Sequence, residues 1–220
     1  MLLDGENEKG VLVSTNVVPT DKGINTETVP LVEEKEKLCS LMLPRFILDN
    51  FDSAKEAAEY IRDYVAIYPP KSLVDMHYEQ HFMVADNEET YLIEFIENEV
   101  IIINMTEGSN STLDNKSYMT NFYLDGVTFN SDGKVYTPET QTETENAFDS
   151  NLITEHGAGL ERYNIIVDNF STANTKSGMR SLMGLLTYTK AYESTTNPFW
   201  YSEFVGEQGS TNLTVKSTVA

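Results

Sequence analysis

Hydrophobic and polar positions alternate over several short stretches of the chain, and such alternation is typical of half-buried β-strands. The first of these stretches covers residues 11–18, between a polar turn at residues 5–10 and Pro19. In the middle of the chain, tight polar turns separate three short apolar runs, which predict a β-meander. These runs cover residues 81–86, 91–97 and 100–104. Residues 117–124 are a further candidate strand.

Apolar residues recur at helical spacing in two stretches before the meander. Between residues 31 and 50 the spacing predicts one helix, which Pro44 kinks or splits in two. Ser53 and Glu56 then form a capping box, which starts a second helix that Pro69 ends. The buried stripe expected along this second helix consists of Ala57, Ile61, Tyr64, Val65 and Tyr68.

The last third of the chain predicts a loop, two helices and a strand. Residues 131–150 are polar and acidic and predict an exposed loop, whereas helical spacing returns at residues 159–170 and 177–192. Residues 212–219 resemble a strand. Because the strands cluster instead of alternating with single helices, the order favours an α+β fold with helices packed on an antiparallel sheet. We expect a single domain over residues 1–220.

The chain is strongly acidic, with 35 Asp and Glu residues against 15 Lys and Arg and a formal net charge of −20. Such a surface repels phosphate backbones and anionic lipids, so we expect no nucleic acid and no membrane as a partner. The N-terminus carries Asp4, Glu6 and Glu8, where a signal peptide needs basic and apolar residues. These features favour a cytoplasmic location.

By residue type and spacing alone, few residues are candidates for metal binding or catalysis. His77 and His81 are four positions apart, but Glu79 stands one place too late for a zincin motif and no third ligand follows. We therefore expect no metal and no cofactor, and interpret the pair as one loop histidine and one strand histidine. Cys39 is the single cysteine, and its apolar surroundings are typical of a buried small hydrophobe rather than a nucleophile.

Several segments nevertheless match known sequence motifs in a fixed order. Residues 4–11 (DGENEKGV) resemble a D-G-M-N-E-K-G-L turn and the strand that follows it. Residues 81–86 (HFMVAD) resemble the strand L-H-W-L-I-A-D. Glu94 and Asn104 then match the glutamate of a following V-E pair and the asparagine that ends the next strand.

Two further matches follow in the same order. Thr120 and Asn121 resemble the last two residues of an L-T-N motif, and residues 159–163 (GLERY) resemble the stretch S-R-F/E-R-Y. Taken together, these motifs resemble those of the choloylglycine hydrolase family, which includes bile salt hydrolases and penicillin V acylases. The similarity runs along nearly the whole chain.

This resemblance implies a fold and a reaction. The fold is the N-terminal nucleophile (Ntn) hydrolase αββα sandwich, in which two antiparallel sheets lie between helical layers; here it would be incomplete. The reaction is hydrolysis of a linear, non-peptide amide bond in a small-molecule acyl amide. In the family, an N-terminal cysteine attacks the amide carbon, its own α-amino group is the base, and an oxyanion hole stabilises the tetrahedral intermediate. Bile salts, penicillin V and N-acyl amino acids or lactones all remain open as substrates.

The resemblance also implies roles for individual residues. Asn121 matches the asparagine that polarises the scissile carbonyl, and Arg162 matches the arginine beside the nucleophile. Where the family places an Asn or Tyr toward the oxyanion, this chain has Val17, with Asn16 one residue earlier and therefore on the other face of the strand. Phe122 would suit an apolar acyl group. The structural alternatives are a strand-end Asn121, a surface Arg162 and a core Phe122.

The family motifs that precede the turn at residues 5–10 are missing, and the nucleophilic cysteine is among them. We interpret the chain as part of a linear-amide hydrolase, truncated at both ends and inactive as given. The alternative is a catalytically dead scaffold that binds an acyl amide or a protein partner. Self-association into a homo-oligomer is left open for the complete protein.

Overall fold

The structure is a computed structural model that describes residues 4–19, 35–75, 78–96, 99–114, 116, 118–127, 129–135, 163–164 and 166–168. The chain divides into two compact units. The first comprises residues 1–127, 148–157 and 220, and the second comprises residues 128–147 and 158–219. Each unit is described by itself.

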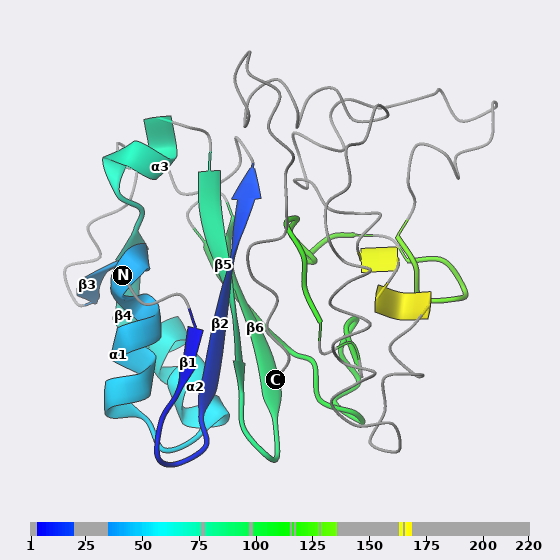
Figure 1. The fold of residues 1–220 in the computed structure, drawn as a ribbon, viewed down its shortest axis with the longest axis horizontal. Helices are drawn as coiled ribbons and strands as arrows, with labels where there is room; N and C mark the ends of the chain where they lie inside the picture. Colours follow the sequence, from blue (N-terminus) through cyan, green and yellow to red (C-terminus); the bar gives the residue numbers. More distant parts are fainter. Residues whose placement is uncertain are drawn as a thin grey trace. The chain divides into compact units, whose positions relative to one another are not determined.

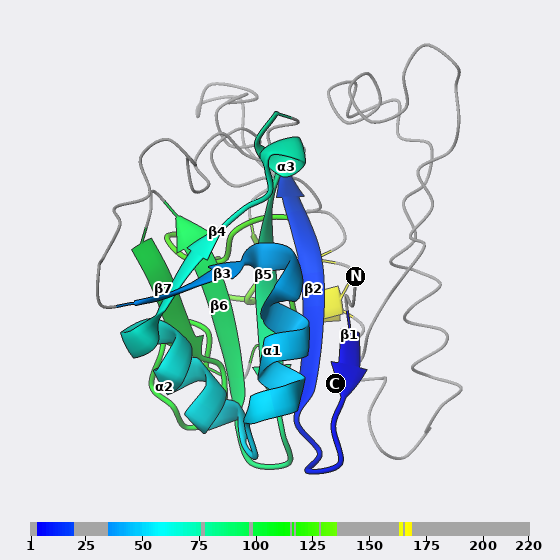
Figure 2. The same ribbon diagram turned by 90° about the vertical axis from the view of Figure 1, so that its left-hand side faces the viewer.

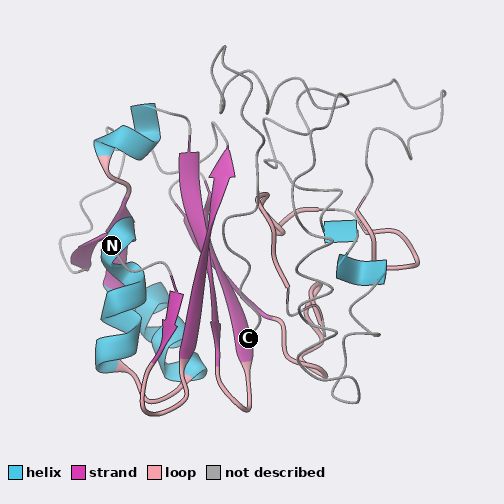
Figure 3. Cartoon of the chain, in the orientation of Figure 1, coloured by secondary structure: helices cyan, strands magenta, loops and turns pink. Residues whose placement is uncertain are grey.

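The first unit is built on a five-stranded antiparallel sheet (Figures 1 and 3). The strand order is β1-β2-β5-β6-β7, so the last three strands form the meander that the sequence predicts. All four strand pairs keep a one-to-one register. The strands are β1 (Asp4–Glu6), β2 (Leu12–Pro19), β5 (Tyr78–Ala85), β6 (Thr90–Ile96) and β7 (Glu99–Asn104).

The turn between β1 and β2 owes its shape to Asn7 and Gly10. The Asn7 carboxamide oxygen accepts the backbone N–H groups of Lys9 and Val11, each at 3.0 Å. Gly10 has φ +83°, a left-handed conformation that glycine adopts without strain. The amide nitrogen of Asn7 donates to the carbonyls of Leu48 and Phe51, at 3.1 and 2.9 Å. This motif therefore ties the hairpin to the end of a helix.

Two helices, α1 (Leu43–Asn50) and α2 (Ala54–Tyr64), cover one face of the sheet (Figure 2). The Ser53 hydroxyl accepts the N–H of Glu56 at 3.2 Å, which confirms the predicted cap of α2. The core lies between these helices and the side chains of one sheet face. It includes Val11, Val13, Ile47, Phe51, Ala57, Ile61, Phe82, Val84, Ile93 and Phe95.

The prediction of a single helix between residues 31 and 50 is wrong for the first half of that range. Residues 31–34 lie outside the described part of the chain, and β3 (Glu36–Cys39) and the short 3₁₀ turn η1 (Ser40–Met42) precede α1. Pro44 does not kink the helix, because it lies in the first turn of α1, where no backbone N–H is needed. Cys39 is half-buried at the end of β3.

The second helix is shorter than its apolar pattern predicts. It ends at Tyr64, and Val65–Tyr68 forms strand β4, which pairs in parallel with β3 before the short helix α3 (Lys71–Asp75). Val65 and Ile67 are buried, as in a strand with one covered face, whereas Tyr64 and Tyr68 are 57% and 42% exposed. These two tyrosines therefore do not belong to a buried helical stripe.

The described part of the second unit is small. Phe129 and Val135 form an isolated antiparallel bridge, and the side chain of Asn164 bonds both the N–H and the carbonyl of Val135, at 2.9 and 2.8 Å. Residues 163, 164 and 166–168 are helical, within the helix predicted for residues 159–170. Val135 is buried, although it lies in the predicted exposed loop. The remainder of that loop, the helix at residues 177–192 and the strand at residues 212–219 lie outside the described residues.

Across the ranges that the structure describes, no helix is long and apolar enough to cross a membrane.

Candidate functional site

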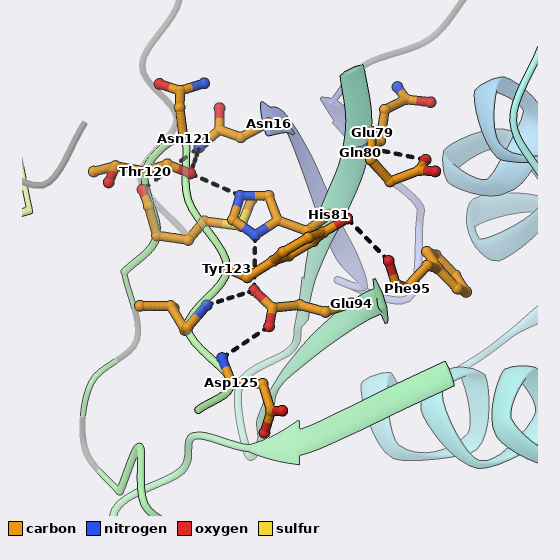
Figure 4. Close-up of polar contacts among 12 residues, drawn as sticks. Asn16, Glu79, Gln80, His81, Glu94, Phe95, Thr120, Asn121, Tyr123 and Asp125 are labelled. Atoms are coloured by element: carbon orange, nitrogen blue, oxygen red, sulfur yellow. Dashed lines mark hydrogen bonds and ion pairs between the residues drawn. The ribbon is translucent and has the colours of Figure 1, made fainter. Parts of the chain in front are cut away.

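The sheet face turned away from α1 and α2 carries buried polar side chains. Side chains alternate along β5 and β6, so Phe82 and Ile93 point toward the helices while His81 and Glu94 point to the opposite face. Asn16 of β2 pairs with His81 across the strands and shares this face. Figure 4 shows these side chains gathered against the segment that contains residues 120–125.

His81 and Glu94 form a pair whose side chains are both 0% exposed. The Nδ1 atom of His81 lies 3.0 Å from Oε1 of Glu94, and its Nε2 atom lies 2.7 Å from the carbonyl oxygen of Thr120. The carbonyl oxygen of Thr120 can only accept, so the Nε2 atom of His81 carries the hydrogen in that bond. Burying polar groups such as these is costly unless the hydrogen bonds around them are complete.

Glu94 completes its own hydrogen bonds with backbone N–H groups. Its Oε1 atom accepts the N–H of Leu124 at 2.8 Å, and its Oε2 atom accepts the N–H of Asp125 at 2.9 Å. The hydroxyl of Tyr123 donates to the carbonyl of Phe95 at 2.9 Å. Residues 117–124 were predicted to be a strand, but residues 118–124 form no regular strand. Its backbone is bonded instead by side chains from β5 and β6 (Figure 4).

The charges and the burial of this cluster change the acidity of two neighbouring groups. Burial raises the pKa of the Tyr123 hydroxyl well above its ordinary value, and the nearby carboxylates of Glu79 and Glu94 raise it further. Burial also raises the pKa of Asp125, with a further contribution from the charge of Glu94. Tyr123 therefore acts here as a neutral donor.

Three of the residues predicted for the site are brought together. The Asn121 side-chain nitrogen donates to the carbonyl of Val17 at 2.7 Å. The Asn16 side-chain nitrogen makes long contacts of 3.5 Å with the carbonyls of Met119 and Thr120 (Figure 4). Because β2 and β5 pair without a bulge from Leu12 to Pro19, Asn16 is not re-aimed and stays on the face of His81.

The other predicted site residues have different surroundings. Phe122 is fully buried, as the alternative of a core residue requires. Its role beside an acyl group stays a prediction. Arg162 and His77 lie outside the described residues. His81 uses both ring nitrogens in hydrogen bonds. Within the described ranges, no group of three or more His, Cys, Asp or Glu side chains is placed to hold a metal ion.

The reasoning from sequence missed the His81–Glu94 pair. Both residues stand in matched motifs, but they are 13 positions apart, and nothing local to either one indicates its partner. A usable signal was present: Glu94 is the one charged residue between Tyr91 and Ile96, in a strand that is otherwise apolar. A carboxylate in such a strand needs buried donors.

No family model matches the sequence, and no curated protein matches it. Solved structures do match its fold. A penicillin V acylase from Agrobacterium tumefaciens aligns with TM-score 0.52 and 15% identity, over 89% of this chain and 54% of that one. A mutant conjugated bile acid hydrolase from Clostridium perfringens aligns with TM-score 0.54 and 16% identity, over 89% of this chain and 61% of that one.

The chain thus spans between about half and three fifths of the length of these two proteins. At these identities the likeness establishes the fold, which is an incomplete Ntn hydrolase αββα sandwich of the α+β class. The described residues supply one five-stranded sheet of that sandwich and the helices on one of its faces. The resemblance to the choloylglycine hydrolases is confirmed at this level.

Proposed function

We propose that this chain is part of a choloylglycine hydrolase-type enzyme, and that the complete protein hydrolyses a linear, non-peptide carbon–nitrogen amide bond. Two features support the proposal: the ordered motifs, and a fold shared with an acylase and a bile acid hydrolase. The observation that carries it is the placement of Asn121, whose carboxamide meets the carbonyl of Val17 on β2. These two positions are matched to the family site and are 104 residues apart in sequence.

In the proposed reaction, the N-terminal cysteine absent from this chain supplies the nucleophile. Its α-amino group takes the thiol proton, and the sulfur bonds to the amide carbon. The carbon–nitrogen bond then breaks, the amine leaves with that proton, and water hydrolyses the thioester to release the acid. Negative charge develops on the amide oxygen during both additions, and fixed hydrogen-bond donors stabilise it.

Asn121 is the proposed donor to this oxyanion. A carboxamide carries N–H donors and a carbonyl acceptor, and the nitrogen of Asn121 donates to the carbonyl of Val17. That bond also fixes the plane of the amide group. Arg162 is the proposed cation beside the nucleophile, where a positive charge lowers the pKa of a thiol. Asn16 and Phe122 remain proposed contacts of the oxyanion region and of the acyl group.

The substrate class that we propose is a small acyl amide. The relatives in fold are named for penicillin V and for conjugated bile acids. N-acyl amino acids and N-acyl lactones carry the same kind of bond. The choice among them depends on the shape of the acyl pocket, so all are included in the test.

The test starts from the protein as its host makes it. Intact mass and N-terminal sequencing should identify a product that begins with cysteine. This product should release amine from penicillin V, glycocholate or an N-acyl amino acid, and iodoacetamide should abolish the release. A product that runs from Met1 to Ala220 and releases no amine would contradict the proposal. Binding of the same amides without turnover would then favour the scaffold alternative.

A further inference from the structure

We propose that the buried His81–Glu94 pair is a positioning device, which holds the backbone of residues 120–125 and thereby fixes the Asn121 carboxamide. Its catalytic consequence rests on the proposed function, whereas its structural part does not. The pair itself is fully buried, so neither residue is a candidate to touch substrate.

The first step of the argument concerns Thr120. Its carbonyl belongs to the peptide unit that ends in the N–H of Asn121, and such a unit is planar. The Nε2 atom of His81 donates to this carbonyl at 2.7 Å. The Cα of Asn121 lies in the same plane as this carbonyl, so a hydrogen bond that holds the oxygen also restricts the position of that Cα. Asn16 approaches the same carbonyl at 3.5 Å.

The second step concerns the other end of the segment. Glu94 accepts the N–H groups of Leu124 and Asp125, while its Oε1 atom is also hydrogen-bonded to Nδ1 of His81. One carboxylate therefore joins the histidine that holds residue 120 to the two amides that follow residue 123. Between the two anchors, the Tyr123 hydroxyl bonds the carbonyl of Phe95, in the same strand as Glu94.

The third step concerns what the segment would otherwise lack. An irregular backbone buried beside a sheet needs partners for its N–H and carbonyl groups, and His81 and Glu94 bond three such groups, those of Thr120, Leu124 and Asp125. If one carboxylate oxygen of Glu94 is replaced by an N–H donor, that donor faces a backbone N–H of Leu124 or Asp125, and the backbone can shift. A displacement of about 1 Å in a catalytic group can lower a rate by about 10²-fold.

The test compares two isosteric changes in the complete protein. Glu94→Gln replaces one acceptor oxygen with an amide nitrogen at the proposed anchor. The matched control is Asp86→Asn, because Asp86 also accepts backbone N–H groups, those of Ala54, Glu88 and Glu89, all at 2.8 Å. Asp86 follows the C-terminal end of β5. Asn121 instead bonds Val17, which pairs with Gln80 near the start of β5. Both variants are compared at equal folded fraction.

The first measurement is independent of activity. Hydrogen–deuterium exchange should accelerate in the peptide that covers residues 118–127 in Glu94→Gln and stay at the wild-type rate there in Asp86→Asn. Equal exchange in this peptide for wild type and Glu94→Gln would overturn the proposal. The same would follow if both variants accelerated its exchange equally.

The second measurement is a double-mutant cycle on kcat, with penicillin V and glycocholate as substrates. Glu94→Gln alone should lower kcat by about 10²-fold, with little change in KM. In an Asn121→Ala background it should lower kcat by less than about threefold, because Glu94 acts through Asn121. Equal losses in both backgrounds would overturn the positioning role. If the wild type hydrolyses neither amide, the proposed function fails for these substrates, and the exchange measurement alone decides whether the pair holds the segment.

Discussion

At the scale of single residues, Asn121 carries the proposed chemistry most directly. Asn121→Ala removes the carboxamide and should lower kcat of the complete protein by about 10²–10³-fold, as the loss of one oxyanion donor does. Steady-state kinetics at equal folded fraction would measure this. Asn50→Ala is the control, since the exposed side chain of Asn50 bonds the carbonyl of Phe46 in α1, and its kcat should not change. An unchanged rate in Asn121→Ala would exclude Asn121 from the site.

Tyr123 gives a second test at this scale. Tyr123→Phe leaves the carbonyl of Phe95 without its hydroxyl donor and should lower the free energy of unfolding by about 1–2 kcal/mol near neutral pH. The pKa of Tyr123 is raised in the folded state, so the wild type loses stability as the pH rises above about 10, where the unfolded tyrosine ionises. The difference between the two proteins should therefore shrink there.

Urea unfolding at several pH values would measure that difference. Tyr64→Phe is the control, since the side chain of Tyr64 is 57% exposed and its replacement should change stability by less than about 0.5 kcal/mol. A gap between wild type and Tyr123→Phe that widens with alkaline pH would contradict the assignment of Tyr123 as a buried neutral donor.

At the scale of elements, Asp86 links the end of β5 to the start of α2. Its burial alone would raise its pKa, but the N–H groups of Ala54, Glu89 and Glu88 outweigh this and hold the pKa below its usual value. The charged carboxylate therefore stabilises the fold above the unfolded pKa of about 3.9, and this contribution is lost as the pH falls through the lower folded value.

Asp86→Asn should accordingly lower the free energy of unfolding by about 1–2 kcal/mol near neutral pH. The deficit should diminish as the pH falls below about 4. Urea midpoints measured across that range would detect the change. A deficit that stays constant with pH would mean that the charge of Asp86 does not contribute.

The elements that could be predicted from the sequence are those whose signals are local. The meander from β5 to β7 has tight turns, and the cap at Ser53 lies three residues from its partner Glu56. Strand β3 was missed because its partner β4 lies about 30 residues away, and no residue in β3 indicates that pairing. The apolar spacing around β3 favours a helix, but pairing with β4 overrides this local preference.

Some residues of the candidate site could be predicted from the sequence, and others could not. Asn16, Val17 and Asn121 were found through motif resemblance, and their convergence depends on the register of β2 and on the path of residues 118–125. Neither could be deduced from spacing. The His81–Glu94 pair was missed, and the segment that it holds was predicted to be a strand. A backbone whose partners are distant side chains has no periodicity that a sequence pattern can reveal.

At the scale of the whole molecule, the net charge of −20 is the dominant long-range feature. Self-repulsion of this size destabilises the compact state. Raising the sodium chloride concentration from about 0.01 M to about 1 M shortens the Debye length from about 30 Å to about 3 Å. The urea midpoint should rise across this series. A midpoint that falls would mean that attractive ion pairs, such as Arg45–Asp49, outweigh the repulsion.

The anchoring of residues 120–125 has a consequence for how this part of the protein can vary. Glu94 contacts the main chain of Leu124 and Asp125, and His81 contacts the main chain of Thr120. The anchors are therefore indifferent to which side chains these three positions carry. Thr120 and Leu124 are buried, so packing limits which side chains fit there, whereas a lineage could change the half-buried side chain of Asp125 while the path of the segment stays the same. Proline is the exception at positions 124 and 125, because it has no N–H to offer.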